Sequence, residues 1–331
     1  MTPTQRRRLL QAIAATPALA ALPWRGVQAQ QRIDTLRIVT GFTPGGTSDT
    51  LCRRVADRMR GGFVRTAVVD NKAGAGGQLA IDLMRSAPTD GSTIVQTPAS
   101  MLMIYPHIYR KLSYDPFVDV APITVACTFE FGFAVGPMVP DSVASMPDFF
   151  AWCKENPMQA NFGSPAAGSV PHFLGVLAGR AGGIDMKHVP FRGTQPAILD
   201  MIGGQIAAVS GPVGEFTQHV KAGKCRLIAT SSSERSRFAP EVPTYAEQGL
   251  KDLQFREWFG FFAPGKTPRD IIDHLNTGLR EALAAPEVVD GLAVMGLEAV
   301  SSTPEELAQM LRTDHDRWGP IVKSIGFSAD S

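Results

Sequence analysis

Residues 36–60 read LRIVT GFTPGGTSDT LCRRVADRMR, and this stretch decides the fold class. The first five residues are a short, mainly apolar run that favours a strand, and a glycine-rich turn follows at once. In the next segment Leu51, Val55 and Met59 recur every four residues, which places them on one face of a helix. The stretch therefore predicts a strand, a tight turn and an amphipathic helix in direct succession.

The same alternation continues along the chain. Thr66–Val69 and Thr93–Gln96 are strand-like, and Gly77–Ser86 between them is helix-like. Short strands that alternate with helices are typical of an α/β fold with a parallel sheet and helices on both faces. Further strands are predicted at Ile123–Val135, Asn161–Gly163, Ala207–Ser210 and Arg226–Thr230, and further helices at Val170–Ala181 and Pro268–Ala284, the latter with Thr267 as its N-cap.

The composition is that of a globular protein with a sizeable core. Of 331 residues, 44% are hydrophobic and 19% are charged, which excludes a disordered, collagen-like or coiled-coil chain. The length fits one large domain or two ordinary ones. Because 32 basic residues balance 31 acidic ones, the net charge of +1 gives no indication of a nucleic-acid partner.

The first 29 residues form a predicted export signal. Arg6, Arg7 and Arg8 precede a short apolar run, Ala12–Leu22, and the small-residue site Val27–Ala29 follows. The paired arginines fit a twin-arginine signal, and the alternative is a disordered or amphipathic N-terminus. Cleavage after Ala29 removes four arginines and no acid, so the net charge changes from +1 to −3. We expect a periplasmic protein.

The cysteines and histidines give no indication of a metal or a cofactor. No C-x-x-C pair or H-E-x-x-H motif occurs, and the six histidines are scattered. One or two disulfides are compatible with an oxidising compartment, but a chain of this length does not need them. Buried thiols are the favoured interpretation for Cys52, Cys127, Cys153 and Cys225.

Two glycine-rich segments, residues 41–49 and 163–172, lie where a predicted strand meets a predicted helix. Glycine lets the backbone approach a ligand closely, and the N–H groups of a helix's first turn favour an anion. Either segment alone is more typical of a capped tight turn, but two of them make ligand binding equally plausible. Arg192 is a candidate ligand clamp or a solvated charge, and His172 a cleft residue or a structural one.

Two catalytic classes are poorly supported. Residues 260–267, GFFAPGKT, match the phosphate-loop pattern G-x-x-x-x-G-K-[ST] letter for letter. Pro264 and Pro268, however, remove backbone donors that a phosphate cradle needs. No serine lies in a G-x-S-x-G motif, and Ser169 beside His172 does not make a triad. We therefore expect a protein that is not an enzyme, with an exported hydrolase as a weaker alternative.

Seven motifs in order resemble the Bug-type substrate-binding proteins of tripartite tricarboxylate transporters. They span nearly all of the chain after residue 30, and the phosphate-loop match overlaps the last of them. They are Ile38–Asp49, Asp70–Gly77, Ala87–Gly91, Tyr114–Pro116, His188–Gly193, Gly203–Gln205 and Trp258–Pro264.

This resemblance implies a two-lobed type II periplasmic binding protein that closes on its ligand like a flytrap. Each lobe would be a mainly parallel sheet flanked by helices, and two crossover strands would lie near Ile123–Val135 and Cys225–Thr230. Lobe one would comprise residues 30–125 and 228–331, and lobe two residues 126–227. The protein would bind a small carboxylate and pass it to membrane permease subunits. We expect a monomer without a cofactor, and a ligand sensor for a signalling partner is the alternative role.

The resemblance also implies a set of ligand-binding residues. Lobe one would contribute Gly45, Gly46, Thr47, Ser48, Pro98, Ala99 and Ser100, and lobe two Gly163, Ser164, Gly168, Ser169, His172, Arg192, Gly193, Thr194 and Gly211. Members that bind amino acids have an aspartate where this chain has Gly211. Its carboxylate would pair with a ligand ammonium, so its loss predicts an anion without an ammonium group, such as a di- or tricarboxylate or an aromatic acid.

Overall fold

The computed structural model describes residues 33–329, so the predicted export signal lies outside the described residues. Within them, ten strands form one sheet in the order β2-β1-β3-β9-β4-β7-β5-β6, and β8 and β10 also pair with β4. The strands are β1 (Thr35–Thr40), β2 (Thr66–Asn71), β3 (Thr93–Pro98), β4 (Val120–Val135), β5 (Asn161–Ser164), β6 (Lys187–Pro190), β7 (Ala208–Pro212), β8 (Arg226–Thr230), β9 (Arg256–Pro264) and β10 (Glu298–Ala299).

Helices connect the strands and cover the sheet. They are α2 (Thr47–Met59), η1 (Ala75–Gly77), α3 (Gln78–Met84), α4 (Ser100–Met103), α5 (Tyr105–Ile108), α6 (Met146–Glu155), α7 (Val170–Gly182), α8 (Thr194–Ile202), α9 (Val213–Lys221), α10 (Arg269–Leu283), α11 (Pro286–Ala293) and α12 (Pro304–Ile325). The predicted α/β class is confirmed.

The N-terminal stretch folds as its sequence predicts. β1 pairs in parallel with both β2 and β3, and α2 and α3 make the two connections between these strands. Leu51, Val55 and Met59 are all buried on α2, because their four-residue spacing places them on the face that packs on the sheet. A second parallel group consists of β6, β5 and β7, with α7 and α8 between them.

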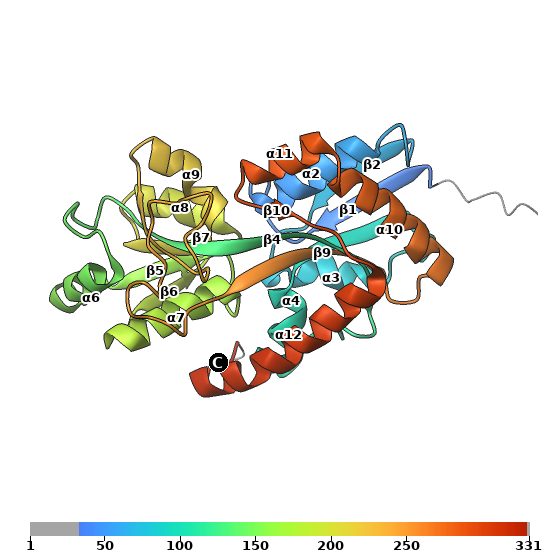
Figure 1. The fold of residues 1–331 in the computed structure, drawn as a ribbon. Coiled ribbons are helices and arrows are strands. Elements are labelled where there is room, and N and C mark those ends of the chain that lie inside the picture. The colour runs from blue at the N-terminus through green and yellow to red at the C-terminus, as the bar shows by residue number, and fades with distance from the viewer. Residues whose placement is uncertain (1–32, 330–331) are drawn as a thin grey trace, which may run out of the picture. The chain divides into compact units, whose positions relative to one another are not determined.

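The 16-residue strand β4 joins these two groups. Its residues 120–130 pair with β9, and Phe131–Val135 pair with β7 and partly with β8. Figure 1 shows β4 and β9 running side by side between the two sets of helices. All pairings of β4 and β9 are antiparallel. The sheet as a whole is therefore mixed: each of the two groups is parallel, as expected, and the antiparallel strands β9 and β4 lie between them.

The segment expected to be the second crossover strand is β8. It pairs with β4 only at Gly132–Val135, and Phe255 still donates its backbone N–H to the carbonyl of Ser231 at 2.8 Å. The strand that follows, β9, is the one that pairs with both β3 and β4. About 25 residues thus lie between the end of β8 and the start of β9. The lobe boundaries themselves stay a prediction.

Three smaller expectations have clear outcomes. The four cysteines are buried free thiols, as predicted. Most of the segment that matches the phosphate loop is strand β9, so it forms no glycine loop. The predicted helix cap is wrong: Pro268 is the N-cap of α10, and the Thr267 hydroxyl is buried without a hydrogen-bond partner in the described part of the chain.

Thr267→Val should stabilise the protein by about 1 kcal/mol, because it replaces an unpaired buried hydroxyl with a methyl group of similar size. Urea unfolding monitored by tryptophan fluorescence measures the difference. If the hydroxyl capped α10, the same change would destabilise the protein by a similar amount, so the sign of the shift decides between the two structures.

Candidate functional site

A cavity of about 50 Å³ lies between the two parallel groups of strands. Residues from β4 and β9 form its wall, and residues at the starts of several helices surround it. The lining residues are Phe42, Thr43, Gly46, Thr47, Ser48, Pro98, Ser100, Met101, Phe129, Phe131, Pro165, Ala166, Ser169, Pro171, Gly193, Thr194, Gln195, Pro212, Glu215, Glu257 and Phe259.

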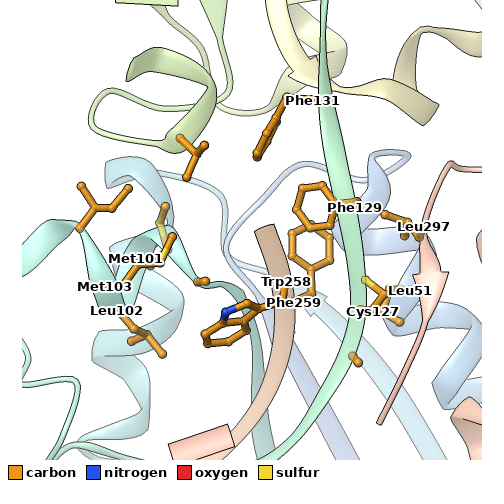
Figure 2. Close-up of a cluster of buried hydrophobic side chains, with 14 of the residues drawn as sticks. Leu51, Met101, Leu102, Met103, Cys127, Phe129, Phe131, Trp258, Phe259 and Leu297 are labelled. Atoms are coloured by element: carbon orange, nitrogen blue, oxygen red, sulfur yellow. The ribbon is translucent and has the colours of Figure 1, made fainter. Parts of the chain in front are cut away.

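One wall of the cavity is aromatic. Figure 2 shows Phe129 and Phe131 on β4, Phe259 beside Phe129, and Met101 on α4. The ring centroids of Phe129 and Phe259 are 4.4 Å apart, and those of Phe129 and Phe131 are 5.4 Å apart. Because all three rings are almost completely buried, this wall offers a ligand a rigid apolar surface.

The polar part of the cavity is built from helix N-termini. Four helices of nine or more residues, α2, α7, α8 and α9, begin at the cavity. The first turn of a helix has free N–H groups and the positive end of the helix dipole, which favour negative charge. The lining residues include no lysine, arginine or histidine. Any attraction for an anion therefore comes from the backbone and hydroxyl groups.

Glu215 brings one carboxylate into this positive region. It lies in the first turn of α9, and its Oε1 accepts hydrogen bonds from the backbone N–H of Thr47 at 3.1 Å and from Thr47 Oγ1 at 2.9 Å. Its Oε2 accepts from Gln195 Nε2 at 3.2 Å. Burial raises the pKa of Glu215, and the hydrogen bonds from Thr47 oppose that shift. Both carboxylate oxygens are thus engaged with this protein's own donors.

Glu257 brings a second carboxyl group, from β9. Only 3% of its surface is exposed. Its Oε1 accepts from the backbone N–H of Ser100 at 2.6 Å and from the Ser100 hydroxyl. Burial raises the pKa of Glu257 to about 7, the hydrogen bonds from Ser100 oppose this, and the negative charge of Asp314 adds to it.

The comparison with known proteins identifies the family. Residues 51–327 match the model of the tripartite tricarboxylate transporter family receptor. The chain belongs to this family. The sequence resemblance to Bug-type receptors is thereby confirmed.

Three solved structures share the fold. The periplasmic binding protein BugD is 26% identical with a TM-score of 0.84, and the match covers 89% of this chain and 98% of that one. Rpa4515 of R. palustris with adipate gives the same four values. MatC of Rhodopseudomonas palustris with bound malate is 27% identical with a TM-score of 0.80, over 87% of this chain and 99% of the other.

As a member of this receptor family, the chain is a periplasmic solute-binding protein of the two-lobed type and not an enzyme. The structural comparison confirms the fold class that the motifs implied. No helix within residues 33–329 is long and apolar enough to cross a membrane. In the same range no three His, Cys, Asp or Glu side chains are grouped so as to hold a metal ion.

Half of the expected ligand-binding residues of this receptor line the cavity, and half do not. The lining ones are Gly46, Thr47, Ser48, Pro98, Ser100, Ser169, Gly193 and Thr194. The others are Gly45, Ala99, Gly163, Ser164, Gly168, His172, Arg192 and Gly211. Whether those that line the cavity contact a ligand stays a prediction.

Local packing explains the second group. Arg192 and Gly45 are exposed to solvent, and Ala99 and Gly163 are buried in the protein. A Cβ atom at Gly211 would lie 2.4 Å from Thr194 Cγ2, so the Thr194 side chain fills the space that an aspartate would need.

His172 and Ser164 belong to a cluster outside the cavity lining. His172 Nδ1 accepts the N–H of Gly168 at 2.9 Å, and the His172 ring stacks on His188 with 3.8 Å between centroids. His188 Nε2 lies 2.7 Å from Ser164 Oγ. These contacts are typical of a structural histidine, the second of the two roles considered for His172.

Neither glutamate of the cavity is among the expected ligand-binding residues. Glu257 stands in an otherwise apolar and aromatic strand, residues 257–263, and a lone acid in such a run is a signal of a buried titratable group. Glu215 follows Gly214 in the first turn of a helix, where an acid is ordinarily only a helix-dipole partner. No local pattern indicates that it contacts Thr47.

The histidine pair predicts acid sensitivity. Burial lowers the pKa of His188 to about 4, and burial together with the neighbouring His188 lowers that of His172 further. The unfolded chain therefore binds more protons than the folded one below about pH 6.5, so the free energy of unfolding falls as the pH drops. Because His172 is almost fully buried and His188 keeps some solvent contact, we expect the pair to cause a loss of about 2–3 kcal/mol between pH 7 and pH 5, and His188→Gln should reduce this loss. Urea unfolding of both proteins at the two pH values tests this, and equal losses in both would contradict it.

Proposed function

We propose that this receptor captures a small carboxylate in the periplasm and delivers it to the permease subunits of a tripartite tricarboxylate transporter. The observation that carries the proposal is the convergence of four helix N-termini on a cavity whose lining has no basic side chain. Backbone N–H groups at helix starts and aligned helix dipoles bind a carboxylate without a counter-charge on a side chain. The aromatic wall accommodates the apolar part of the same molecule.

The structurally similar receptors support this ligand class. One of them is described with adipate and another with malate, and both molecules are dicarboxylates without an ammonium group. In this chain the side chain of Thr194 occupies the space beside Gly211, and both oxygens of Glu215 are engaged. We therefore propose a di- or tricarboxylate or an aromatic acid as ligand rather than an amino acid.

The binding step is proposed to be a closure of the two lobes. Ser100 Oγ accepts the N–H of Val170 at 3.3 Å, and Thr47 donates to Glu215, so groups from both sides of the cavity already meet. A ligand favours such an arrangement only through contacts with both sides. We also propose that the export signal is cleaved after Ala29.

A thermal-shift screen tests the ligand class. The acids are succinate, malate, adipate, citrate and benzoate, with aspartate and glutamate as amino-acid controls. A ligand at 100 times its dissociation constant stabilises the folded state by about 2.7 kcal/mol, which for a chain of this size is a rise of roughly 5 °C. A rise with aspartate or glutamate and none with the five acids would overturn the proposed ligand class. The permease partnership is tested separately, by loss of uptake of the bound acid when the receptor gene is deleted.

A further inference from the structure

The lining of the cavity is unexpected for a receptor of anions. Two buried carboxyl groups line it, and none of its lining residues is basic. A carboxylate ligand would meet two negative charges if both groups were ionised. At least one of them must then be neutral or turned away when the ligand is bound. The hydrogen bonds show which group is suited to be neutral.

The hydrogen bonds of Glu257 leave one of its two oxygens able to carry a proton. Ser100 Oγ accepts the N–H of Val170, so its own hydrogen is free to point to Glu257 Oε1. Oε1 also receives the backbone N–H of Ser100. Both lone pairs of Oε1 are thereby used, as in a carbonyl oxygen, while no hydrogen bond from the described residues reaches Oε2.

Glu215 has the opposite arrangement. Thr47 donates twice to its Oε1 and Gln195 once to its Oε2, so both oxygens act as acceptors. This is the pattern of an ionised carboxylate, and its charge lies at the N-terminus of α2, where it is stabilised. The hydrogen bonds of Glu215 therefore favour its ionised form, whereas Glu257 has one oxygen, Oε2, that can carry a proton.

The surroundings of Glu257 also disfavour its ionised form. Asp314 on α12 adds negative charge nearby while accepting a hydrogen bond from Trp258 Nε1 at 2.8 Å. Tyr105 on α5 lies within electrostatic range, and burial raises its pKa so that it stays neutral. Phe129, the β4 residue in register with Glu257, and Phe259 contribute apolar surface. Glu215 is the other ionisable group of the cavity lining.

We propose that Glu257 binds the ligand in its acid form, with its Oε2–H donating a hydrogen bond to a carboxylate oxygen of the ligand. The ligand is then captured together with one proton, which Glu257 retains in the complex. This inference rests on the proposed function, because it requires a carboxylate ligand. It assigns to Glu257 the recognition role that a basic side chain would otherwise have in an anion site.

The test measures dissociation constants by calorimetry at pH 6 and pH 8.5, with adipate, malate, succinate, citrate and benzoate as probes. With a pKa of about 7 in the free protein, the acid form falls from about nine-tenths to about one-thirtieth, so binding should weaken about 30-fold at pH 8.5. The histidines of the buried pair do not titrate in this range, since their pKa values lie at about 4 and below. At pH 8 each bound acid should take up close to one proton, measured in two buffers of different ionisation enthalpy.

Glu257→Gln and Glu215→Gln form the matched pair of variants. The amide of Glu257→Gln keeps an oxygen for Ser100 and a donor for the ligand, so it should bind the acids about equally at both pH values and more tightly than wild type at pH 8.5. Glu215→Gln should weaken binding at both pH values, because it disturbs the acceptors of Thr47, yet keep the 30-fold ratio.

The outcomes separate the two proposals. Binding of the acids with equal affinity at both pH values, or its loss in Glu257→Gln, overturns the proton-linked role and leaves the carboxylate receptor intact. Binding of aspartate or glutamate that strengthens with pH and is lost in Glu257→Gln overturns it as well, in favour of an ammonium partner. If no acid binds wild type at either pH, the proposed function itself fails.

Discussion

Replacing Gly214 with alanine should weaken ligand binding by about 10- to 100-fold, the equivalent of about 1–3 kcal/mol of overpacking. The added methyl carbon would lie 1.6 Å from the carbonyl oxygen of Met295 and 2.6 Å from the backbone nitrogen of Gly296. Both are backbone atoms, so the start of α9 must move away from the turn that leads into β10. That movement displaces Glu215, the next residue, from its hydrogen bonds to Thr47 at the cavity.

Intrinsic helix propensity alone predicts that Gly214→Ala stabilises α9 rather than displacing its start. Alanine is favoured over glycine within a helix by up to about 1 kcal/mol, so without the close approach the change would stabilise α9. Gly62→Ala is the matched control, because nothing lies within 4 Å of its added carbon and its φ is not in the left-handed region. Calorimetry with the tightest-binding acid of the screen measures the effect. A dissociation constant unchanged in Gly214→Ala would show that the contact with Met295 is not part of the ligand-binding state.

Phe133→Ala should cost about 3–5 kcal/mol of unfolding free energy, the range for a buried phenylalanine. Its side chain, on β4, is fully buried, and its ring lies 5.3 Å from that of Phe149 and 6.4 Å from that of Phe162. The change therefore opens a cavity at the point where β4 enters the second group of strands. For a chain of this size the melting temperature should fall by roughly 10 °C.

Phe117→Ala is the control for this prediction, because Phe117 is 39% exposed and lies outside the core. Differential scanning calorimetry of the three proteins gives the comparison. A loss for Phe133→Ala no larger than that for Phe117→Ala would mean that the aromatic cluster around β4 contributes little to stability.

Local sequence patterns predicted the parts of the fold that depend on neighbouring residues. The spacing of Leu51, Val55 and Met59 located α2, and the alternation of strands and helices predicted the parallel group that contains β1. Such patterns do not predict the pairing of β9 with β4, because this pairing joins residues more than 120 positions apart. Periodicity within one segment contains no information about such a partner.

In the site, too, the sequence predicted the features that depend on neighbouring residues and not those that depend on distant ones. Glycine-rich turns followed by helices correctly located the starts of α2 and α7 at the cavity, since a helix start depends on its own few residues. The carboxyl groups of Glu215 and Glu257 enter the cavity through contacts with Thr47 and Ser100, which lie about 160 residues away in each case. The filling of the space at Gly211 by Thr194 is likewise a tertiary contact. Only the folded chain brings these groups together.

The four helix N-termini have a consequence for how such receptors diversify. Their attraction for an anion resides in main-chain groups, which a point mutation does not remove. Side chains at the cavity surface, such as Phe131 or Met101, are then free to change during evolution without loss of the basic affinity for carboxylates. A duplicated gene can thus acquire a new acid as its ligand by changes that alter the shape of the cavity.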